Sequence, residues 1–219
     1  MPRRSKDDLR DTRTAIIEAA MRGFGEKGFA ATSTRETAAL AGTNVASIAY
    51  HFGGKEGLRA ACAEHIVKVM GEVLAAARAG DEPPASPEAA ERTLAALVHT
   101  MVRFLLLDPQ ARLVAGFILR EMAEPSAALD IIYGGLFEGL HRRLCAIWGV
   151  ATGAAPESEP VRLAVFAAIG QIVYFHLGRP VVQRRMDWPT IGPAEARAIA
   201  ETVVQNLSAR LAADRGRAP

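Results

Sequence analysis

Hydrogen-bonding and cationic side chains are concentrated between residues 34 and 55 of this 219-residue chain. Ser47, Tyr50 and His51 can donate or accept hydrogen bonds, and Lys55 carries a positive charge. Ala46 is small enough to let the backbone come close to the edge of a base. Together these residue types favour contact with a sugar-phosphate backbone and with base edges.

Two short helices joined by a tight turn would hold these side chains in place. Ser33 or Thr34 can cap the first helix by accepting a hydrogen bond from a free backbone N–H group, and Glu36 would lie near its positive end. The first helix should end near Ala41, because Gly42 tolerates the positive φ angle that closes a helix. Such a helix-turn-helix unit is too small to form a core, but it can enter a groove of DNA.

The second helix of the pair is predicted to have two different faces. Asn44 can cap it, and Ile48 and Phe52 lie four residues apart on an apolar face. The other face carries small and polar residues, which are Ala46, Ser47, Tyr50 and His51. Two glycines then end this helix, and Lys55 begins a longer one, whose free N–H groups and dipole suit a phosphate oxygen.

Three motifs between about residues 12 and 66 match a known pattern. They are AxxxFGEKGF at 20–29, TSTRETAALAG at 32–42 and SIAYHFGGKEGL at 47–58. With these motifs the N-terminal part resembles the TetR family of bacterial transcriptional regulators. The resemblance implies that the second helix reads the major groove of double-stranded operator DNA. The matching positions are Val45, Ala46, Ser47, Tyr50 and His51.

The same resemblance implies that Thr34, Arg35 and Lys55 touch phosphates or flanking bases. Two positions depart from the family pattern. Thr43 stands where the family usually has Val, and Ala49 stands where it usually has a Tyr that contacts phosphate. The helix-turn-helix prediction is unchanged, but the set of phosphate contacts differs from the usual one.

Composition and charge agree with a DNA-binding N-terminal part. Half of the residues are hydrophobic, which excludes a disordered chain. Residues 1–59 hold ten Lys or Arg against seven Asp or Glu, a net charge of +3, whereas the remainder holds sixteen against seventeen, a net charge of −1. Arg3 and Arg4 could form a basic arm or belong to a disordered terminus. The N-terminal residues lack the apolar run of a signal peptide, so we expect a cytoplasmic protein.

The sequence offers no constellation of catalytic or metal-binding residues. Residues 23–28 fit G-x-G-x-x-G, but a helix is expected before them, where the dinucleotide-binding motif requires a strand. The five His residues include no i,i+4 pair, and neither HExxH nor GxSxG occurs. Cys62 and Cys145 lack metal-ligand spacing and are expected to be reduced thiols. We therefore predict a protein that is not an enzyme and that has no cofactor and no metal site.

Helical periodicity extends over nearly the whole chain and predicts an all-α fold. Beyond the helix pair, helices are expected over Leu9–Lys27, from Lys55 to about Arg78, from Ser86 to Leu107, from Asp108, from Pro125 to about Ala151, over Val161–Leu177 and over Pro193–Ala213. We predict a helix-turn-helix domain over residues 1–60 and an effector-binding and dimerisation domain over residues 61–219. The helix from Lys55 would connect the two domains.

The helix over 161–177 is predicted to be covered on two sides, because it is apolar around almost its whole circumference. Arg162, Gln171 and His176 interrupt it, so a membrane span is not expected. This helix and the one over 193–213 could pair with their copies in a second chain and form a four-helix homodimer interface. A two-fold dimer would present two recognition helices to successive major grooves.

Two strings in the C-terminal half are similar to the CecR-like subgroup of the TetR family, whose members are linked to sensitivity towards cephalosporin- and chloramphenicol-type compounds. They are REMAEPSAALD at 120–130 and GQIVYFHLGRPVVQRRMDW at 170–188. The similarity implies a helical domain that binds a small-molecule effector and dimerises. Candidate effector-binding residues are Met101, Phe104, Phe117, Arg120, Tyr133, Phe137, His141, Gln171, Tyr174 and His176.

Structural explanations exist for each of these candidates. The aromatic residues and Met101 could be ordinary core, and Arg120 beside Glu121 could form an ion pair that holds their helix in place. Gln171 and His176 could be satisfied by backbone or water instead of a ligand. We predict a homodimeric, ligand-responsive DNA-binding repressor. The alternatives are a helical enzyme or carrier, which would need no duplex, and a membrane-surface or scaffold protein.

Overall fold

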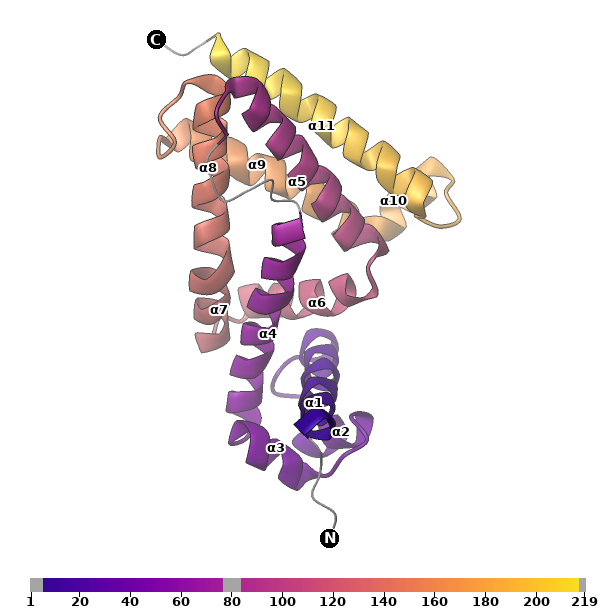
Figure 1. Ribbon diagram of the computed structural model, residues 1–219. Coiled ribbons are helices and arrows are strands. Elements are labelled where there is room, and N and C mark those ends of the chain that lie inside the picture. Colours follow the sequence, from indigo (N-terminus) through magenta and orange to yellow (C-terminus); the bar gives the residue numbers. More distant parts are fainter. Residues whose placement is uncertain (1–5, 77–83, 217–219) are drawn as a thin grey trace. The chain divides into compact units, whose positions relative to one another are not determined.

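The computed structural model describes residues 6–76 and 84–216, and every regular element in these ranges is a helix (Figure 1). In chain order they are α1 (Lys6–Lys27), α2 (Thr34–Leu40), α3 (Val45–Phe52), α4 (Lys55–Ala76), α5 (Pro87–Leu107), α6 (Pro109–Ala123), α7 (Ala127–Ile132), a π-helical turn (Tyr133–Phe137), α8 (Glu138–Thr152), α9 (Glu159–Leu177), α10 (Arg179–Met186) and α11 (Pro193–Arg215). The predicted all-α fold class is confirmed. The expected end of the α4 helix near Arg78 falls outside the described residues.

The chain folds into two compact units. Unit 1 comprises the residues up to Val69 together with Arg112–Gly135, and unit 2 comprises Met70–Ala111 together with the residues from Leu136 onwards. By packing, α7 and most of α6 therefore belong with the N-terminal helices, although they follow α5 in the chain. The predicted functional division at residue 60 remains a proposal.

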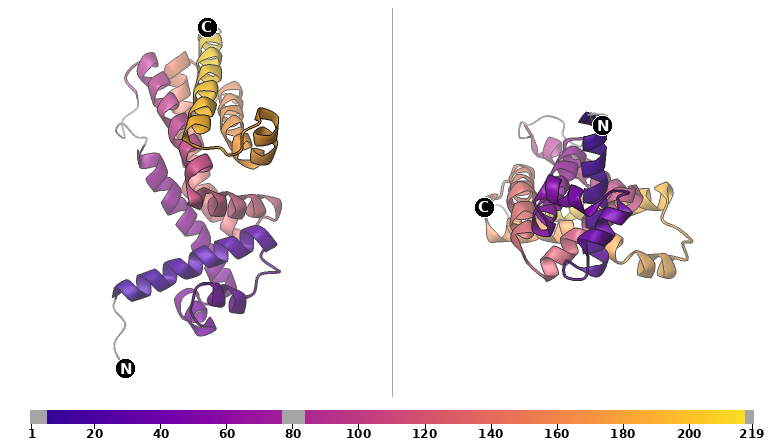
Figure 2. Two further views of the ribbon diagram at one scale, coloured as in Figure 1. Left: turned by 90° about the vertical axis from the view of Figure 1, so that its right-hand side faces the viewer. Right: turned by 90° about the horizontal axis from the view of Figure 1, so that it is seen from below.

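Unit 1 is built on apolar contacts among α1, α4 and α6. The Phe24 ring lies 6.2 Å from the Phe117 ring, centroid to centroid, and both side chains are buried. Gly25 lets α1 approach α6 closely, because a Cβ atom at this position would lie 3.1 Å from the carbonyl carbon of Gly116. Figure 2 shows α1 crossing α4, where the Cys62 thiol donates to the Ile17 carbonyl at 3.7 Å.

Unit 2 packs α5, α8, α9 and α11 around one apolar core. Trp148 and Leu211 are almost fully buried, and Ser86 caps α5 as predicted by accepting from the Ala89 N–H at 3.2 Å. Figures 1 and 2 show α5 and α11 side by side, in agreement with their packing. At the start of α11, Glu195 accepts a hydrogen bond from the Gly192 N–H at 2.9 Å.

Both cysteines are free and buried, as the sequence predicted for reduced thiols. Burial is the main cause that raises the pKa of the Cys62 thiol, and the nearby Glu121 carboxylate adds to this effect. Burial also raises the pKa of Cys145. Since the thiolate is the reactive form, burial disfavours reaction at both cysteines.

Two local features were not predicted from the sequence. The expected single helix after Pro125 is instead α7, a π-helical turn and α8, with the boundary between the units inside the π turn. Gly135 in this turn approaches Val67, whose side chain would lie 2.9 Å from a Cβ atom. Helix α10 was also missed. Pro180 fits its first turn, and the preceding Arg179 donates to the Leu106 and Ile191 carbonyls at 3.2 and 3.1 Å.

Helix α9 exposes much of its apolar surface. Within the described ranges it is the one helix long and apolar enough to cross a membrane, with a mean hydropathy of 1.4, yet only 22% of its most apolar window is buried. It packs against α5, α8, α10 and α11, so it is part of the folded core of unit 2. Leu163 and Phe166 remain 60% exposed, and Tyr174 remains 56% exposed. Among the described residues, the other helices of unit 2 therefore do not supply the second cover that was expected for this helix.

Candidate DNA-binding surface and effector cavity

Capping fixes both helices of the predicted helix-turn-helix. Ser33 accepts a hydrogen bond from the Glu36 N–H at 3.1 Å, so it, and not Thr34, caps α2. Asn44 caps α3 by accepting from the Ser47 N–H at 3.0 Å. Gly42, in the turn between them, has a φ of +65°, a conformation that suits glycine. The local sequence therefore sets the start of both helices.

Helix α3 has an inner and an outer face, as predicted. Ile48 is 1% exposed and anchors the helix in unit 1, whereas Tyr50 is 80% exposed. Phe52 is only half-buried, and the Arg13 guanidinium lies 5.3 Å from the centre of its ring. Val45, Ala46 and Ala49 are exposed beside Tyr50. We define the outer face of α3 as these three residues and Tyr50. Its side chains are small, except for that of Tyr50.

Ser47 and His51 are less exposed than the outer face. The Ser47 hydroxyl lies 2.9 Å from the Thr43 hydroxyl and donates to the Asn44 side-chain oxygen at 3.2 Å. This hydroxyl therefore supports the cap of α3, which sequence reasoning did not anticipate. The His51 ring lies edge-on to Tyr50, with 5.0 Å between ring centroids.

Lys55 is held in position at the start of α4. Its Nζ atom lies 4.4 Å from the centre of the Phe29 ring and donates to the Ala30 carbonyl at 3.4 Å. An ammonium group has three N–H donors, so it keeps donors for a phosphate. Lys55 is also the first residue of α4, and the free N–H groups of a first helical turn favour an anion as well.

On α2, Arg35 is exposed and Thr34 is half-buried at the first helical position. The Lys27 ammonium already forms an ion pair with the Glu36 carboxylate within unit 1. Arg3 and Arg4, the candidates for a basic arm, lie outside the described residues. The structure thus gathers the eight predicted DNA-binding residues on α2, α3 and the start of α4.

A largely buried ion pair between α4 and α6 was missed by the sequence analysis. Arg59 on α4 donates to the two carboxylate oxygens of Glu121 on α6 at 2.7 and 2.9 Å. Ser126, which caps α7, donates to the same carboxylate at 2.7 Å. The Arg59 guanidinium also lies 4.5 Å from the centre of the Phe29 ring. Glu121 does form a structural ion pair, but its partner is Arg59 and not the adjacent Arg120.

The predicted effector-binding residues do not form one cluster. Phe117, Arg120 and Tyr133 belong to unit 1, where Phe117 is core and Arg120 lies 3.9 Å from Glu124. The others belong to unit 2, and they are Met101, Phe104, Phe137, His141, Gln171, Tyr174 and His176. Sequence spacing alone could not separate the two groups, because α6 and α7 pack apart from their chain neighbours.

Several of the unit 2 candidates have protein partners. Nδ1 of His176 lies 2.7 Å from the Leu105 carbonyl, and Gln171 accepts from Asn206 on α11 at 3.2 Å. His141 stacks on Phe166 with 4.0 Å between ring centroids. These contacts supply the structural partners that the sequence analysis left open for Gln171 and His176.

Unit 2 contains an apolar cavity of about 100 Å³ that is partly open to solvent. Fifteen residues from α4, α5, α8, α9 and α11 line it, and every one is Leu, Val, Ile, Ala, Met or Trp. Of the predicted effector-binding residues only Met101 is among them. Leu74 brings α4 to the cavity wall.

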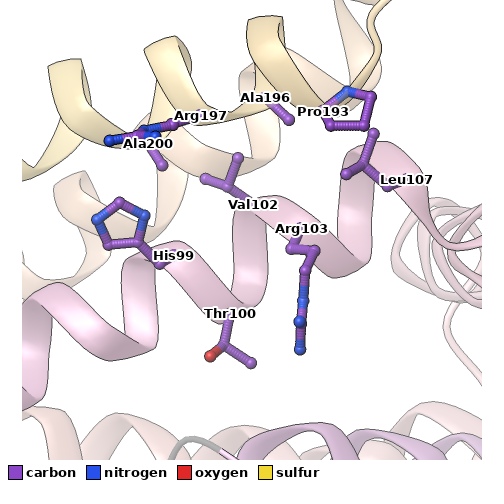
Figure 3. Close-up of a pocket in the computed structure, with 9 residues that line it drawn as sticks. All are labelled: His99, Thr100, Val102, Arg103, Leu107, Pro193, Ala196, Arg197 and Ala200. Atoms are coloured by element: carbon purple, nitrogen blue, oxygen red, sulfur yellow. The ribbon is translucent and has the colours of Figure 1, made fainter.

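A second hollow lies on the surface between α5 and α11 and has a volume of about 360 Å³. Figure 3 shows Thr100 and Arg103 pointing away from α11. Arg197 donates to Glu201 at 2.8 Å, so this guanidinium is already paired. Because its cations do not converge, this groove does not define a ligand site.

Among the described residues no group of His, Cys, Asp or Glu side chains is placed to hold a metal ion. Residues 23–28, which fit the dinucleotide motif, form the end of α1 and the turn after it. A helix precedes them, as expected.

Comparison with known proteins identifies both parts of the chain. Residues 16–62 match the family described as bacterial regulatory proteins, tetR family, and residues 90–213 match the C-terminal domain of the HTH-type transcriptional dual regulator CecR. The chain is 33% identical over 197 residues to CecR of Shigella flexneri, which covers 88% of this chain and 87% of that protein. It is 35% identical over 82 residues to the regulator TtgR of Pseudomonas putida, which covers 37% of this chain and 39% of that one.

Solved structures share the fold. AibR in complex with isovaleryl coenzyme A and operator DNA has a TM-score of 0.66 at 17% identity, covering 88% of this chain and 96% of that one. The SmeT–triclosan complex has a TM-score of 0.60 at 19% identity, covering 89% and 90%. With its capped helix-turn-helix and these matches, the chain belongs to the TetR family of transcriptional regulators, with a CecR-type C-terminal domain, and is not an enzyme.

Proposed function

We propose that the chain binds a palindromic DNA operator as a homodimer, represses transcription there and is released by a small-molecule effector. The observation that carries the DNA-binding part is the outer face of α3 beside the positioned Lys55. Small residues at 46 and 49 let the helix backbone approach base edges, and Tyr50 beside them is 80% exposed. A chromosomal operator also requires the protein to be cytoplasmic.

Each predicted DNA-binding residue has a role in this proposal. Arg35 and Lys55 neutralise phosphates, and Thr34 donates to a flanking group. The groove-facing positions are Val45, Ala46, Ser47, Tyr50 and His51. Because Ala49 cannot make the phosphate contact of the usual Tyr, Lys55 carries a larger share of the backbone affinity.

Replacement of Lys55 by Ala tests this assignment. We expect weaker binding to every DNA sequence, because an interaction with phosphate is independent of base identity. The slope of log Kobs against log[salt] should become shallower by about 0.9 for each phosphate that the variant no longer neutralises, in each subunit. Fluorescence anisotropy with duplexes selected from genomic DNA, at several salt concentrations, measures both effects.

Lys27→Ala is the matched control, since the Lys27 ammonium already pairs with Glu36. Its salt slope should equal that of the wild type. Far-UV circular dichroism checks that unit 1 stays folded when the Lys55 ammonium no longer lies over the Phe29 ring. An unchanged slope for folded Lys55→Ala would show that this residue does not neutralise a phosphate.

The exposed apolar face of α9 supports a homodimer, with a second copy of this chain as the occupant. Leu163, Phe166 and Tyr174 are exposed on a helix that is otherwise part of the folded core of unit 2. The Gln171–Asn206 hydrogen bond joins α9 to α11 on the exposed side, so both helices contribute to one surface. In a two-fold dimer that binds a palindromic operator, the two α3 helices have to reach successive major grooves, which are about 34 Å apart.

Introduction of a charge into this face should separate the subunits. We expect Leu163→Glu to give a monomer in sedimentation velocity at concentrations where the wild type is a dimer, because the interface would bury an unpaired carboxylate. Met122→Glu, at an equally exposed position on α6, should remain dimeric. A monomeric wild type, or a dimeric Leu163→Glu, would contradict the proposed interface.

The effector part of the proposal is supported by structural relatives. AibR was solved with isovaleryl coenzyme A and operator DNA, and SmeT with triclosan. We extend ligand responsiveness to unit 2 of this chain, where Met101 lines the apolar cavity. An effector releases DNA only if it binds more tightly to the conformation in which the two α3 helices are spaced wrongly for DNA.

A further inference from the structure

The cavity of unit 2 offers a ligand no free hydrogen-bonding side chain. Among its fifteen lining residues only Trp148 has a polar side-chain group, the indole N–H. That N–H donates to the Asp214 carboxylate on α11 at 3.3 Å, so it is committed within the protein. The remaining lining side chains are aliphatic or thioether groups on helices, whose backbone N–H and C=O groups bond to each other.

Such a lining disfavours the binding of charged ligands. An ionised carboxylate, phosphate or ammonium that entered the cavity would lose its hydration and gain no partner, which is strongly unfavourable. An apolar molecule has no such hydration to lose, and it gains dispersion contacts with the side chains that line the cavity. Apolar cavities of about 150 Å³ in other proteins stay dry and bind benzene.

The size of the cavity further restricts which ligands can bind. A volume of about 100 Å³ is about two-thirds of that of a benzene-binding cavity, so only a small molecule can enter. Met101, which is half-buried and has three rotatable bonds, can change rotamer and enlarge the space. A substituted single ring or a short branched aliphatic compound would then fit.

We propose that this cavity is the effector site and that the effector is a compact, uncharged, apolar compound. Leu74 in the wall belongs to α4, the helix that begins with the phosphate-contacting candidate Lys55. A bound ligand therefore contacts the helix that leads to the DNA-binding surface. This inference rests on the proposed function, whose DNA-binding part is measured separately below.

Two probes of matched shape test the chemistry. In p-xylene two methyl groups flank one ring, and in 4-methylbenzoate one of them is replaced by a carboxylate. The full-length Trp188→Phe variant leaves Trp148 as the single tryptophan, so its fluorescence reports on the cavity wall. We expect p-xylene to change this fluorescence saturably and to raise Tm, and 4-methylbenzoate to do neither at tenfold higher concentration.

A variant that fills the cavity tests whether p-xylene binds there. Ala168 lines the cavity, so Ala168→Leu fills it from α9 and should weaken p-xylene binding at least tenfold. Ala96 lies on the exposed side of α5, and Ala96→Leu adds the same atoms away from the cavity. This control should bind p-xylene as the wild type does.

The possible results test the ligand class, the effector role and the proposed DNA-binding function separately. Absence of p-xylene binding, equal binding of 4-methylbenzoate, or unchanged binding in Ala168→Leu would overturn the assigned ligand class. Saturating p-xylene should weaken DNA retardation at least threefold in the wild type, and bound p-xylene that leaves DNA affinity unchanged would overturn the effector role. A protein that retards no genomic fragment without any ligand would refute the proposed function instead, whatever p-xylene does.

Discussion

Replacement of Glu121 by Ala is expected to destabilise unit 1 by about 3–5 kcal/mol. The Glu121 side chain is 2% exposed and that of its partner Arg59 is 15% exposed, so the variant would leave a guanidinium in a largely dry environment without a counter-charge. The Ser126 hydroxyl would lose its acceptor as well. This loss equals two to nearly four powers of ten in the unfolding equilibrium constant.

The cysteines provide a local measurement of this effect. Cys62 is the single thiol of unit 1, so in a Cys145→Ala background the labelling of Cys62 in urea reports the opening of unit 1 alone. Glu124→Ala is the control, because Glu124 is 67% exposed and 3.9 Å from Arg120, and it should change stability by less than about 0.5 kcal/mol. The double variant Arg59→Met with Glu121→Leu should recover most of the stability, since apolar residues can replace a buried ion pair. Equal effects of Glu121→Ala and Glu124→Ala would contradict a structural role for the buried pair.

Replacement of Gly57 by Ala should impair both folding and DNA binding. A Cβ atom at Gly57 would collide with the backbone carbonyl oxygen of Phe52, the last residue of α3. A backbone atom cannot rotate away as a side chain can, so the end of α3 must move relative to α4. We expect a stability loss of about 1–3 kcal/mol and, because α3 is the proposed recognition helix, a loss of DNA affinity of at least about tenfold.

Gly71→Ala in the same helix is the matched control. Nothing lies within 4 Å of a Cβ atom at Gly71, so Ala should fit and stabilise α4 by about 0.5–1 kcal/mol. Thermal unfolding and anisotropy on the same DNA compare the two variants. If Gly57→Ala matched Gly71→Ala in both assays, the close approach of α3 and α4 would have no functional importance.

Local chemistry allowed much of this fold to be predicted. Asn44 and Ser86 were identified as caps because a side-chain oxygen at a helix start needs only neighbours three residues away. The two faces of α3 followed from the period of one helix, with Ile48 buried and Tyr50 exposed.

Features that depend on distant residues were not predictable in this way. The Arg59–Glu121 pair joins residues 62 positions apart, so no spacing rule points to it, and the neighbouring Arg120 was the natural partner to expect. The effector candidates were chosen by residue type, whereas the cavity is defined by aliphatic residues that look like ordinary core, such as Leu144 and Ile172. Helix α10 was not predicted, and Arg179 at its start donates to carbonyls on α5 and before α11 that only the fold brings near.

The Phe29 ring limits how the protein can evolve. One aromatic side chain supports both Lys55, which we assign to phosphate contact, and Arg59, which neutralises the buried Glu121. A substitution at residue 29 would therefore change operator affinity and folding together, and few such changes would be neutral. The outer face of α3 has no comparable constraint, since Val45, Ala46 and Tyr50 are exposed and contribute little to folding. Divergence of operator specificity among close relatives should accordingly accumulate on α3, with an aromatic residue retained at position 29.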